Sequence, residues 1–283
     1  MNSPIRVEAE IEELWERYQS GLNADDATAD DRAVLDRFLD ALERGEIRAA
    51  EKTGDTVSSW QVNEWVKHGV LLNFGLRKTQ RWEYGDVGYN DVLPLRETAD
   101  LRTRGTRNTP DGTVLRRGTY LGSDVIVMSP SFLNIGVHVG NDSLVDSCDT
   151  IGSCAQIGAG VKLGANTLIG GVLEPIEDAP VIIEDGVSIG AGCRVTSGFR
   201  VGADTVVGEN TLLTPRIPVY DLVDDEVRYG HLPANRRAFA RSIRSSVSDH
   251  DLFDGDAYKP AVVATHLDET TLETTQREAT LRE

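Results

Sequence analysis

Arginines gather at one place in a chain that is otherwise acidic. The 283 residues carry 46 aspartates and glutamates against 29 lysines and arginines, a formal net charge of −17. Within residues 104–117 the chain nevertheless places Arg104, Arg107, Arg116 and Arg117. An arginine guanidinium is a planar fork that pairs well with a carboxylate or a phosphate. The cluster therefore indicates either a site for an anionic ligand or a set of surface ion pairs.

One carboxylate stands out for a different reason. Asp146 follows the apolar residue Val145 at a place where most repeats of this chain carry glycine. A carboxylate there must project from a corner of the backbone, where it could orient an amine and take its proton. The alternative is a turn in which the aspartate side chain caps nearby backbone. Both interpretations depend on the repeat that positions Asp146.

That repeat returns an apolar residue at every sixth position. These anchor residues are Leu115, Leu121, Val127, Leu133, Val139, Val145, Ile151, Ile157, Leu163 and Ile169, and after a break Ile183, Ile189, Val195, Val201, Val207 and Leu213. The residue after an anchor is usually glycine, which suggests backbone angles that only glycine adopts easily. A period of six fits neither a heptad nor an alternating strand. It is the hexapeptide repeat.

The hexapeptide repeat predicts a parallel β-helix. Each hexad supplies one short strand and one corner, three hexads close a triangular coil, and the anchors stack inside it. Sixteen visible hexads, with a break long enough to hide about two more, predict roughly six coils. The break contains Gly170 to Pro175, where we expect a loop to leave the coils. Such loops commonly build sites, which makes Glu174 a candidate residue.

Helical patterns precede the coils. Apolar residues at helical spacing predict helices over residues 5–20 and 31–44. The segment 60–74 predicts a third helix, buried by Trp60 and Trp65. We expect these three helices to pack together as a small cap.

The segments on either side of the coils lack the hexad pattern. Residues 78–114 predict an irregular connection, residues 220–229 a hairpin, and Ala261 to Ala264 a strand, while the polar tail from Asp268 is either helical or disordered. The predicted organisation has three parts: a helical N-terminal cap and connection (1–110), a β-helix (111–217) and a small C-terminal α/β extension (218–283).

The amino-acid composition restricts the kinds of partner that the protein could bind. The acidic, lysine-poor balance argues against nucleic acid or an anionic membrane as partner, and resembles proteins of a halophilic, high-salt cytoplasm. Cys148, Cys154 and Cys193 lack the paired spacing of a zinc site, so we expect packing residues and no metal. There is no signal-peptide pattern and no apolar run long enough to cross a bilayer, which predicts a cytoplasmic protein.

Several segments carry a more specific pattern than the repeat. They are Trp60 to Phe74, Pro130 to Gly136, Val145 to Ser147, Ile151 to Gly158, Gly170 to Pro175, Ile182 to Asp185 and Glu226 to Gly230. The strings Gly-Ser-Cys-Ala-Gln-Ile-Gly and Gly-Gly-Val-Leu-Glu-Pro are not demanded by the hexads. In these segments the chain resembles the tetrahydrodipicolinate N-succinyltransferases, a branch of the hexapeptide-repeat acyltransferases.

This resemblance implies a fold, a reaction and an assembly. The fold class would be mainly β, a left-handed parallel β-helix with an N-terminal α-helical cap, its hand an exception to the usual right-handed crossover. The reaction would move a succinyl group from succinyl-CoA, as cosubstrate and without a permanently bound cofactor, to an amino-keto diacid in lysine and diaminopimelate biosynthesis. The assembly would be a homotrimer with active sites between neighbouring subunits.

The resemblance also assigns residues. Arg107, three places before Pro110, matches the substrate-binding arginine of the family, and Asp146 matches its acidic site residue. The chain departs from the family at Arg194, which stands where a glutamate is proposed as a catalytic partner. The chain therefore lacks, at this position, the second acid that a two-acid mechanism requires.

A direct transfer needs no nucleophile from the protein, because a thioester is already activated and positioning lowers much of the barrier. Asp146 would orient the amine and take its proton, and Arg107 would clamp an acceptor carboxylate. Glu174 is a second catalytic candidate, with a purely structural role in its loop as the alternative. Lys162, or the arginine cluster from Arg236 to Arg244 with Arg241 and Arg244 foremost, would bind the CoA phosphates.

Three other functions fit parts of the pattern. The first is the same chemistry with acetyl-CoA, since the size of the acyl pocket is invisible in a sequence. The second is a histidine-based hexapeptide acetyltransferase that uses His138, the one histidine inside the coils, although no acidic residue is its neighbour in sequence. The third is a β-helix scaffold without catalysis, against which Asp146 and the arginine cluster argue.

Overall fold

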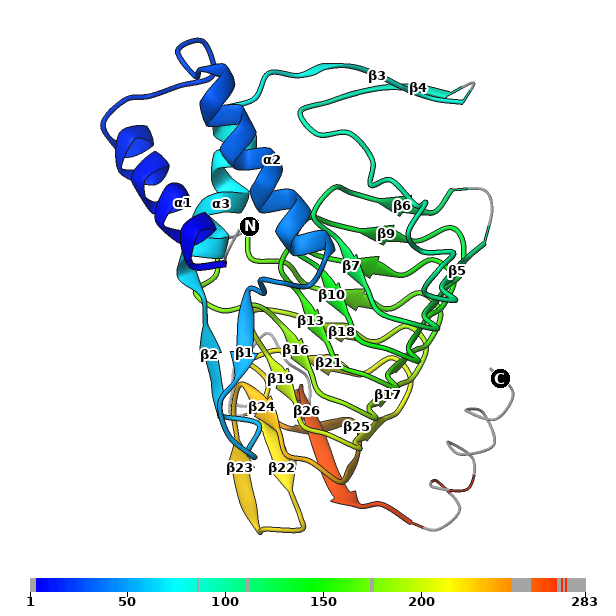
Figure 1. Cartoon of the computed structure of the whole chain (residues 1–283). Coiled ribbons are helices and arrows are strands. Elements are labelled where there is room, and N and C mark those ends of the chain that lie inside the picture. The colour runs from blue at the N-terminus through cyan, green and yellow to red at the C-terminus, as the bar shows by residue number, and fades with distance from the viewer. Residues whose placement is uncertain are drawn as a thin grey trace.

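The computed structural model describes residues 4–85, 87–109, 112–173, 176–245, 256–268, 271 and 273. A stack of three-sided coils forms its centre, with helices at one end and further strands at the other (Figure 1). The hexapeptide repeat predicts a parallel β-helix, and every pair of adjacent strands within the coils is parallel. None of the described helices is long and apolar enough to cross a membrane.

The coils have three faces. The first, which we call the ribbon face, comprises β7 (Tyr120–Leu121), β10 (His138–Val139), β13 (Gln156–Ile157), β16 (Ile182–Ile183), β19 (Arg200–Val201) and β24 (His231–Leu232). The loop face comprises β6 (Val114–Leu115), β9 (Phe132–Leu133), β12 (Thr150–Ile151), β15 (Leu168–Ile169), β18 (Arg194–Val195) and β21 (Leu212–Leu213).

The third face, the cleft face, continues into the C-terminal strands. It comprises β5 (Arg107–Asn108), β8 (Ile126–Val127), β11 (Leu144–Val145), β14 (Lys162–Leu163), β17 (Ser188–Ile189), β20 (Val206–Val207) and β25 (Arg236–Arg244), followed by β26 (Tyr258–His266), β22 (Val219–Asp221) and β23 (Glu226–Arg228). The ribbon and loop faces have six strands each, which confirms the expected number of coils.

The anchors form the core. Each predicted anchor is the second residue of a two-residue strand, and all of them are at most 4% exposed. Parallel pairing sets each anchor above the one three hexads later, as Val145 above Leu163, so the apolar side chains stack along the axis. Burying them removes apolar surface from water in every coil, and this is the main stabilisation of such a stack.

The hexads are distributed differently from the prediction in two places. Ile169 on the loop face is followed by Ile183 on the ribbon face, the next face in order, so the break hides no hexads and is one long corner. The repeat also continues beyond Leu213. After the β22–β23 hairpin, Leu232 pairs with Val201 and closes the last coil.

Glycine follows the anchors for a reason other than the one expected. A Cβ at Gly140 would lie 2.5 Å from the carbonyl carbon of Gly158, and one at Gly164 would lie 2.7 Å from the backbone N of Ala191. Close approach of the next coil therefore demands glycine there. Positive φ angles occur instead two places further on, for example at Gly136 (φ 77°) and Cys148 (φ 64°).

The N-terminal cap consists of α1 (Pro4–Gln19), α2 (Ala29–Glu43) and α3 (Glu64–Gly75). The first two confirm the predicted helices, and Thr28 with Asp31 forms a capping box at the start of α2. The third prediction was wrong at its beginning. Residues Trp60–Val62 form β2, which pairs with β1 (Ala50–Lys52) as a two-stranded ribbon lying along the coils (Figure 1).

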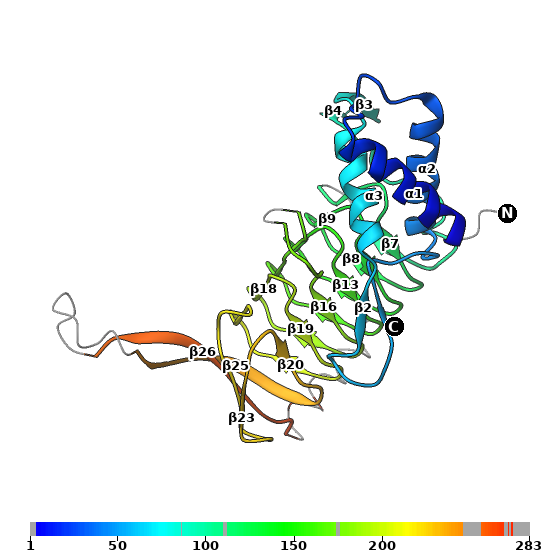
Figure 2. The same cartoon turned by 90° about the vertical axis from the view of Figure 1, so that its left-hand side faces the viewer.

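The connection and the C-terminal extension are richer in strands than expected. The residues predicted to be irregular contain a hairpin of β3 (Gln80–Tyr84) and β4 (Val87–Asp91), as well as β5. The predicted hairpin near residues 220–229 and the strand over Ala261–Ala264 are confirmed as β22–β23 and β26. Strands β25 and β26 pair antiparallel and extend away from the coils as an arm (Figure 2).

Candidate active site

A cleft of about 1020 Å³ lies along the cleft face. Its lining includes Asp146, Lys162, Arg237, Phe239 and Arg241. The strand register explains this gathering, because Leu144, Lys162, Ser188, Val206 and Arg237 follow one another from strand to strand as the outward residues of this face. Two of these outward positions hold cations, and Asp146 lies at the corner directly after Leu144 and Val145.

Asp146 occupies a corner that the next coil approaches closely. Its amide donates to the carbonyl of Leu163 over 3.2 Å, whereas the amide of Gly164 at the same place in the next coil donates over 2.8 Å. The Oδ1 atom of Asp146 accepts the amide of Ser147 at 2.7 Å. Its Oδ2 atom has no partner among the described residues. The half-buried carboxylate therefore caps its corner with one oxygen and leaves the other available to a ligand.

Arg107 lies on the same face as Asp146 but is not one of the residues that line this cleft. It is exposed, pairs through β5 with Ile126, and so lies two strands from Leu144. At roughly 4.8 Å per strand this is a backbone separation on the order of 10 Å, within reach of a long side chain and a small diacid. No partner for the Arg107 side chain is found among the described residues.

The other three arginines of the cluster serve as ion pairs. Arg104 Nε lies 3.3 Å from Asp100 Oδ2, and Arg117 Nε lies 2.9 Å from Glu43 Oε1. Arg116 pairs with Asp91 at the end of the β3–β4 hairpin. The surface-pair interpretation therefore holds for these three, and Arg107 differs from them.

The predicted phosphate-binding residues separate into two groups. Lys162 and Arg241 line the cleft, and the Arg241 guanidinium lies 4.6 Å from the Phe239 ring centroid. Arg244 lies at the end of β25, pairs with Asp256 at 2.8 Å, and is not part of the cleft lining. Arg237, a member of the same predicted arginine cluster, also lines the cleft and pairs with Asp268 at 2.6 Å.

The remaining predicted residues lie elsewhere. Glu174 falls outside the described residues. Arg194 is exposed on β18 of the loop face, between Leu168 and Leu212, and is not part of the cleft lining of its own chain. Among the described residues, no group of three or more histidines, cysteines, aspartates or glutamates is arranged to hold a metal ion.

The thiols differ from one another. Cys154 and Cys193 are buried as packing residues, and burial raises the pKa of both thiols, that of Cys154 to about 12. Cys148 is exposed, so the packing prediction was wrong for it. Its φ of 64° turns the chain at the corner that carries Asp146.

Asp149 is the site residue that the sequence analysis overlooked. It is 1% exposed and lies at the same corner as Asp146. Burial raises the pKa of Asp149 to about 8, and the charge of Asp146 adds to this shift, whereas backbone hydrogen bonds from Thr167 and Asp146 oppose it. The signal was present in the sequence, because a charged residue occupies the small or β-branched slot four places after the anchor Val145.

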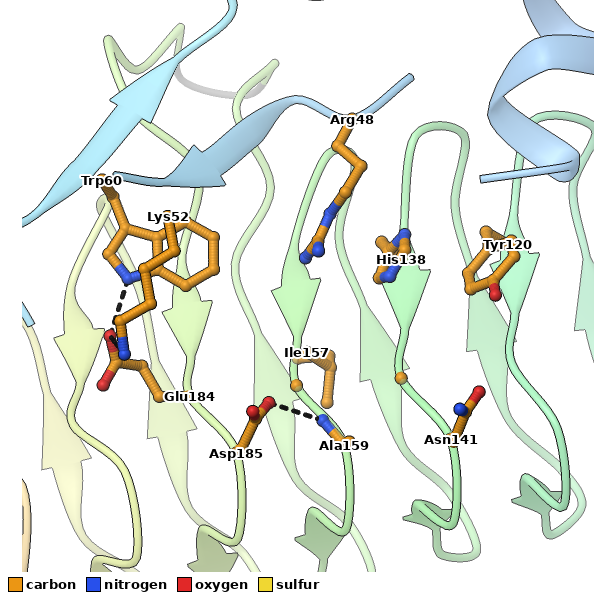
Figure 3. A pocket seen from close by; sticks show the side chains of 12 residues that line it. Arg48, Lys52, Trp60, Tyr120, His138, Asn141, Ile157, Ala159, Glu184 and Asp185 are labelled. Atoms are coloured by element: carbon orange, nitrogen blue, oxygen red, sulfur yellow. Dashed lines mark hydrogen bonds and ion pairs between the residues drawn. The ribbon is translucent and has the colours of Figure 1, made fainter. Parts of the chain in front are cut away.

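A second cavity of about 320 Å³ lies between the β1–β2 ribbon and the ribbon face (Figure 3). His138 lines it and stacks on Tyr120 with ring centroids 4.3 Å apart. Its Nδ1 atom is buried without a partner, and burial together with the charge of Arg48 lowers its pKa to about 3. His138 is therefore neutral near pH 7, and no carboxylate of the described residues bonds its ring to orient it.

Coils built from hexads, with a cleft along one face, define the class of hexapeptide-repeat proteins. Residues 6–76 match the sequence model of the N-terminal part of tetrahydrodipicolinate N-succinyltransferase. The chain is 36% identical over 250 residues to the 2,3,4,5-tetrahydropyridine-2,6-dicarboxylate N-succinyltransferase of Polynucleobacter asymbioticus, which covers 86% of this chain and 88% of that relative. The protein belongs to the tetrahydrodipicolinate N-succinyltransferase family of acyltransferases.

Other relatives agree. The enzyme of the same name from Xylella fastidiosa (strain Temecula1) is 35% identical over 265 residues, with 92% of each chain covered, and that of Methylorubrum extorquens is 37% identical over 233 residues, with 80% and 81% covered. Among solved structures, a GDP-perosamine N-acetyltransferase from Caulobacter crescentus aligns with a TM-score of 0.25 and 16% identity over 48% of this chain and 47% of that one. That likeness is too slight to support an argument.

Proposed function

We propose that the protein transfers a succinyl group from succinyl-CoA to the amine of tetrahydrodipicolinate in its open-chain form, 2-amino-6-oxopimelate. The observation that carries this proposal is the corner of Asp146. In a chain of this family, a half-buried carboxylate with one oxygen that meets no partner in the described part of the chain lines a cleft that also holds Lys162 and Arg241. This is a suitable place for an amine that must lose a proton beside an anionic cosubstrate.

The transfer is a single displacement. The amine nitrogen attacks the thioester carbonyl, a C–N bond forms, the C–S bond breaks, and the CoA thiolate leaves. Asp146 Oδ2 accepts the proton that the nitrogen loses. A carboxylate beside an ammonium group raises the pKa of that group, so Asp146 takes the proton during the attack rather than before it.

The charges of the cleft face divide between the two substrates. Arg107 binds an acceptor carboxylate, for which a free planar guanidinium is well suited. Lys162 and Arg241 bind CoA phosphates at the cleft. Arg244 contributes less, because it is already paired with Asp256. Glu174 remains a second catalytic candidate on the loop between Ile169 and Ile183.

The active form is a homotrimer of left-handed coils, with each site shared between neighbouring subunits. Strands β1 and β2 contact the ribbon face in their own chain through Lys52 and Trp60, which both bond Glu184 (Figure 3). Neighbouring subunits would meet the cleft and loop faces. The outward residues Leu168 and Leu212 of the loop face are 37% and 39% exposed, an apolar surface that a neighbouring subunit would cover. A monomeric mass by light scattering in high salt would contradict the shared site.

A thiol-release assay tests the reaction. Succinyl-CoA and acetyl-CoA are each supplied with an amino-keto diacid, and free CoA thiol is followed with time. We expect release with succinyl-CoA that depends on the acceptor. Faster release with acetyl-CoA would favour an N-acetyltransferase of the same chemistry, and no release with either donor would favour a scaffold. The histidine-based alternative is weakened by the half-buried ring of His138, whose pKa is lowered to about 3 by burial and by the charge of Arg48.

A further inference from the structure

Asp149 belongs to a column of side chains that bond the backbone at one corner of the coils. The column is formed by the residue four places after each anchor of the cleft face. In the other coils it holds Ser131, Thr167, Cys193 and Thr211. Asp149 thus puts a carboxyl group where its neighbours in the stack have a hydroxyl or a thiol.

These neighbours donate hydrogen bonds to corner carbonyls. Ser131 Oγ donates to the carbonyl of Asp146 over 2.9 Å, and Thr211 Oγ1 donates to the carbonyl of Gly208, three residues earlier, over 2.6 Å. Thr167 bonds Gly164, also three residues earlier. An ionised carboxylate can only accept hydrogen bonds. Asp149 can therefore play the part of its neighbours only while it keeps a proton.

The surroundings of Asp149 favour that proton. Its Oδ1 atom accepts the amide of Thr167 at 2.7 Å, and its Oδ2 atom is buried with no partner among the described residues. Thr211 and Thr167 each bond the carbonyl three residues earlier, and for Asp149 that carbonyl belongs to Asp146, although a backbone hydrogen bond from Asp146 itself lowers the pKa of Asp149. A protonated Oδ2 donates a hydrogen bond to the Asp146 carbonyl oxygen in the same way that Thr211 Oγ1 donates to the carbonyl of Gly208. An ionised Oδ2 would leave a buried charge unpaired, which is costly.

We propose that Asp149 is a positioning residue for Asp146: its neutral carboxyl group donates Oδ2–H to the Asp146 carbonyl oxygen and fixes the corner from which the Asp146 side chain projects. Ser131 completes the arrangement, since it accepts the Asp149 amide at 3.2 Å and donates to the same carbonyl. Loss of the proton removes a donor and puts a second negative charge beside Asp146. The corner then loosens as the pH rises.

The charges around Asp149 simplify its titration. Ser131 and Thr167, the groups of the same column in the coils on either side, are uncharged. Asp146 is the one charged group among the described residues that acts on the Asp149 carboxyl, and its charge raises the pKa, as burial does. Proton loss is therefore expected near pH 8 and not near 4.

Infrared and stability measurements test the neutral acid. The variants are Asp149→Thr, which restores the hydroxyl of the column, and Asp149→Asn, with Asp142→Asn as a control that removes an exposed carboxylate. We expect a protonated-carboxyl C=O band at pH 6 that fades towards pH 9 in the wild type, remains in Asp142→Asn and is absent from both Asp149 variants. An ionised Asp149 at pH 6 would overturn the proposal.

The sign of the stability effect is fixed by the two pKa values. The pKa of Asp149 is about 8 in the folded state and about 3.9 in the unfolded state. The folded state binds the proton more tightly, so the contribution of this proton is full below about pH 4 and is lost progressively up to about pH 8. From about pH 4 to about pH 8, the free energy of unfolding of Asp149→Thr should therefore increase relative to that of the wild type. Above about pH 8 the difference between the two proteins should stay constant. A difference that does not vary with pH would contradict a neutral Asp149.

Two further measurements test the positioning of Asp146. The amide proton of Ser147, which bonds Asp146 Oδ1, should change its NMR shift through about pH 8 in the wild type and not in Asp149→Thr. This readout does not depend on turnover. The second measurement is kinetic and rests on the proposed function. From pH 7 to pH 9, kcat of the wild type should fall about tenfold relative to kcat of Asp149→Thr, because a group with a pKa of about 8 loses its proton over this range.

The outcomes separate the two proposals. Asp149 could prove neutral while the NMR shift of Ser147 does not change with pH and the kcat profiles of wild type and Asp149→Thr run parallel. That result would make Asp149 purely structural and overturn its positioning role. Absence of succinyl transfer, with the infrared band and the Ser147 shift behaving as expected, would overturn the proposed function and leave the Asp149–Asp146 relationship in place.

Discussion

Trp60 and Glu184 are separated by 124 residues in the sequence and joined by a 2.7 Å hydrogen bond from the indole Nε1 to the carboxylate Oε1 (Figure 3). Glu184 is 3% exposed, and its other partners are Lys52 Nζ at 3.1 Å and the amide of Ala203 at 3.0 Å. This one carboxylate therefore holds both strands of the β1–β2 ribbon against the coils. A buried carboxylate is tolerated only when its oxygens are paired, so each donor matters.

Replacing Trp60 by Phe should weaken the attachment of the ribbon. The change keeps an aromatic ring and removes one hydrogen bond to a charged group, which is worth about 1.5–3 kcal/mol. We expect a loss of that size in the free energy of unfolding, measured by denaturant titration. Trp82→Phe is the matched control: its indole donates to the neutral carbonyl of Asp91 over 2.9 Å, so the loss should be about 0.5–1.5 kcal/mol. Equal losses would mean that Glu184 does not depend on Trp60.

The bond between Trp60 and Glu184 also shows where sequence reasoning stops. The anchors could be predicted because their period depends only on neighbours within the coil, and each of them is buried. Segment 60–74 has a helical pattern, yet Trp60 is in a strand because its partners are Lys52 in β1 and a residue more than a hundred places away. No local pattern contains that information.

The site was predictable to a similar extent. Asp146 was found because it breaks the glycine rule, and the register brings it into a cleft with Lys162 and Arg241. The break after Ile169 was misjudged because its length alone does not say whether it holds strands or one long corner. Asp149 broke the rule of its own slot, but its burial and its bond to Thr167 become evident only when the coils are stacked.

Arg107→Lys should impair binding of the acceptor. Lysine keeps the charge but loses the planar fork that binds a carboxylate with two hydrogen bonds. We expect KM for the amino-keto diacid to rise about tenfold or more, and KM for succinyl-CoA to change by less than about twofold, since a bond to a charged group is worth about 1.5–3 kcal/mol. Arg102→Lys, also exposed, serves as the control and should change neither. Similar increases for both substrates would place Arg107 outside the acceptor site.

Thiols should be dispensable for turnover. Cys148 is exposed at the Asp146 corner and is the thiol that a covalent mechanism would use. Because a thioester reacts directly with an amine, Cys148→Ser should retain turnover of the same order, measured by product formation rather than by thiol release. The buried Cys193→Ala serves for comparison and should cost stability rather than rate. A folded Cys148→Ser that is inactive would indicate an acyl-enzyme.

Salt should stabilise the protein. With a formal net charge of −17, exposed carboxylates repel one another, and molar salt screens this repulsion because the Debye length falls to about 3 Å at 1 M. We expect the melting temperature to rise steadily from low to molar KCl. Melting temperatures measured in a matched series of sucrose concentrations serve as the control. They distinguish charge screening by KCl from the exclusion of a solute from the protein surface. A melting temperature that falls with KCl would show that ion pairs such as Arg117 with Glu43 outweigh the repulsion.

Asp146→Asn tests the proposed base most directly. Asparagine keeps an Oδ1 atom that can accept the amide of Ser147, so the corner should hold its shape and the fold should survive. The amide nitrogen that replaces Oδ2 cannot take a proton from the acceptor amine. A positioned general base is worth about 10²- to 10⁴-fold in rate, so kcat should fall by that amount while KM for succinyl-CoA changes little.

The decisive comparison for Asp146→Asn is with Asp142→Asn, which removes an exposed carboxylate from another corner residue, one with a positive φ of 59° that asparagine accepts readily. Both variants lose one negative charge, so a general effect of charge on CoA binding would appear in both. Only the loss of a base lowers kcat in Asp146→Asn alone. If a folded Asp146→Asn of unchanged assembly is nearly fully active, the aspartate is a corner cap and the base must be sought at Glu174, because the pKa of His138, about 3, makes it a poor base.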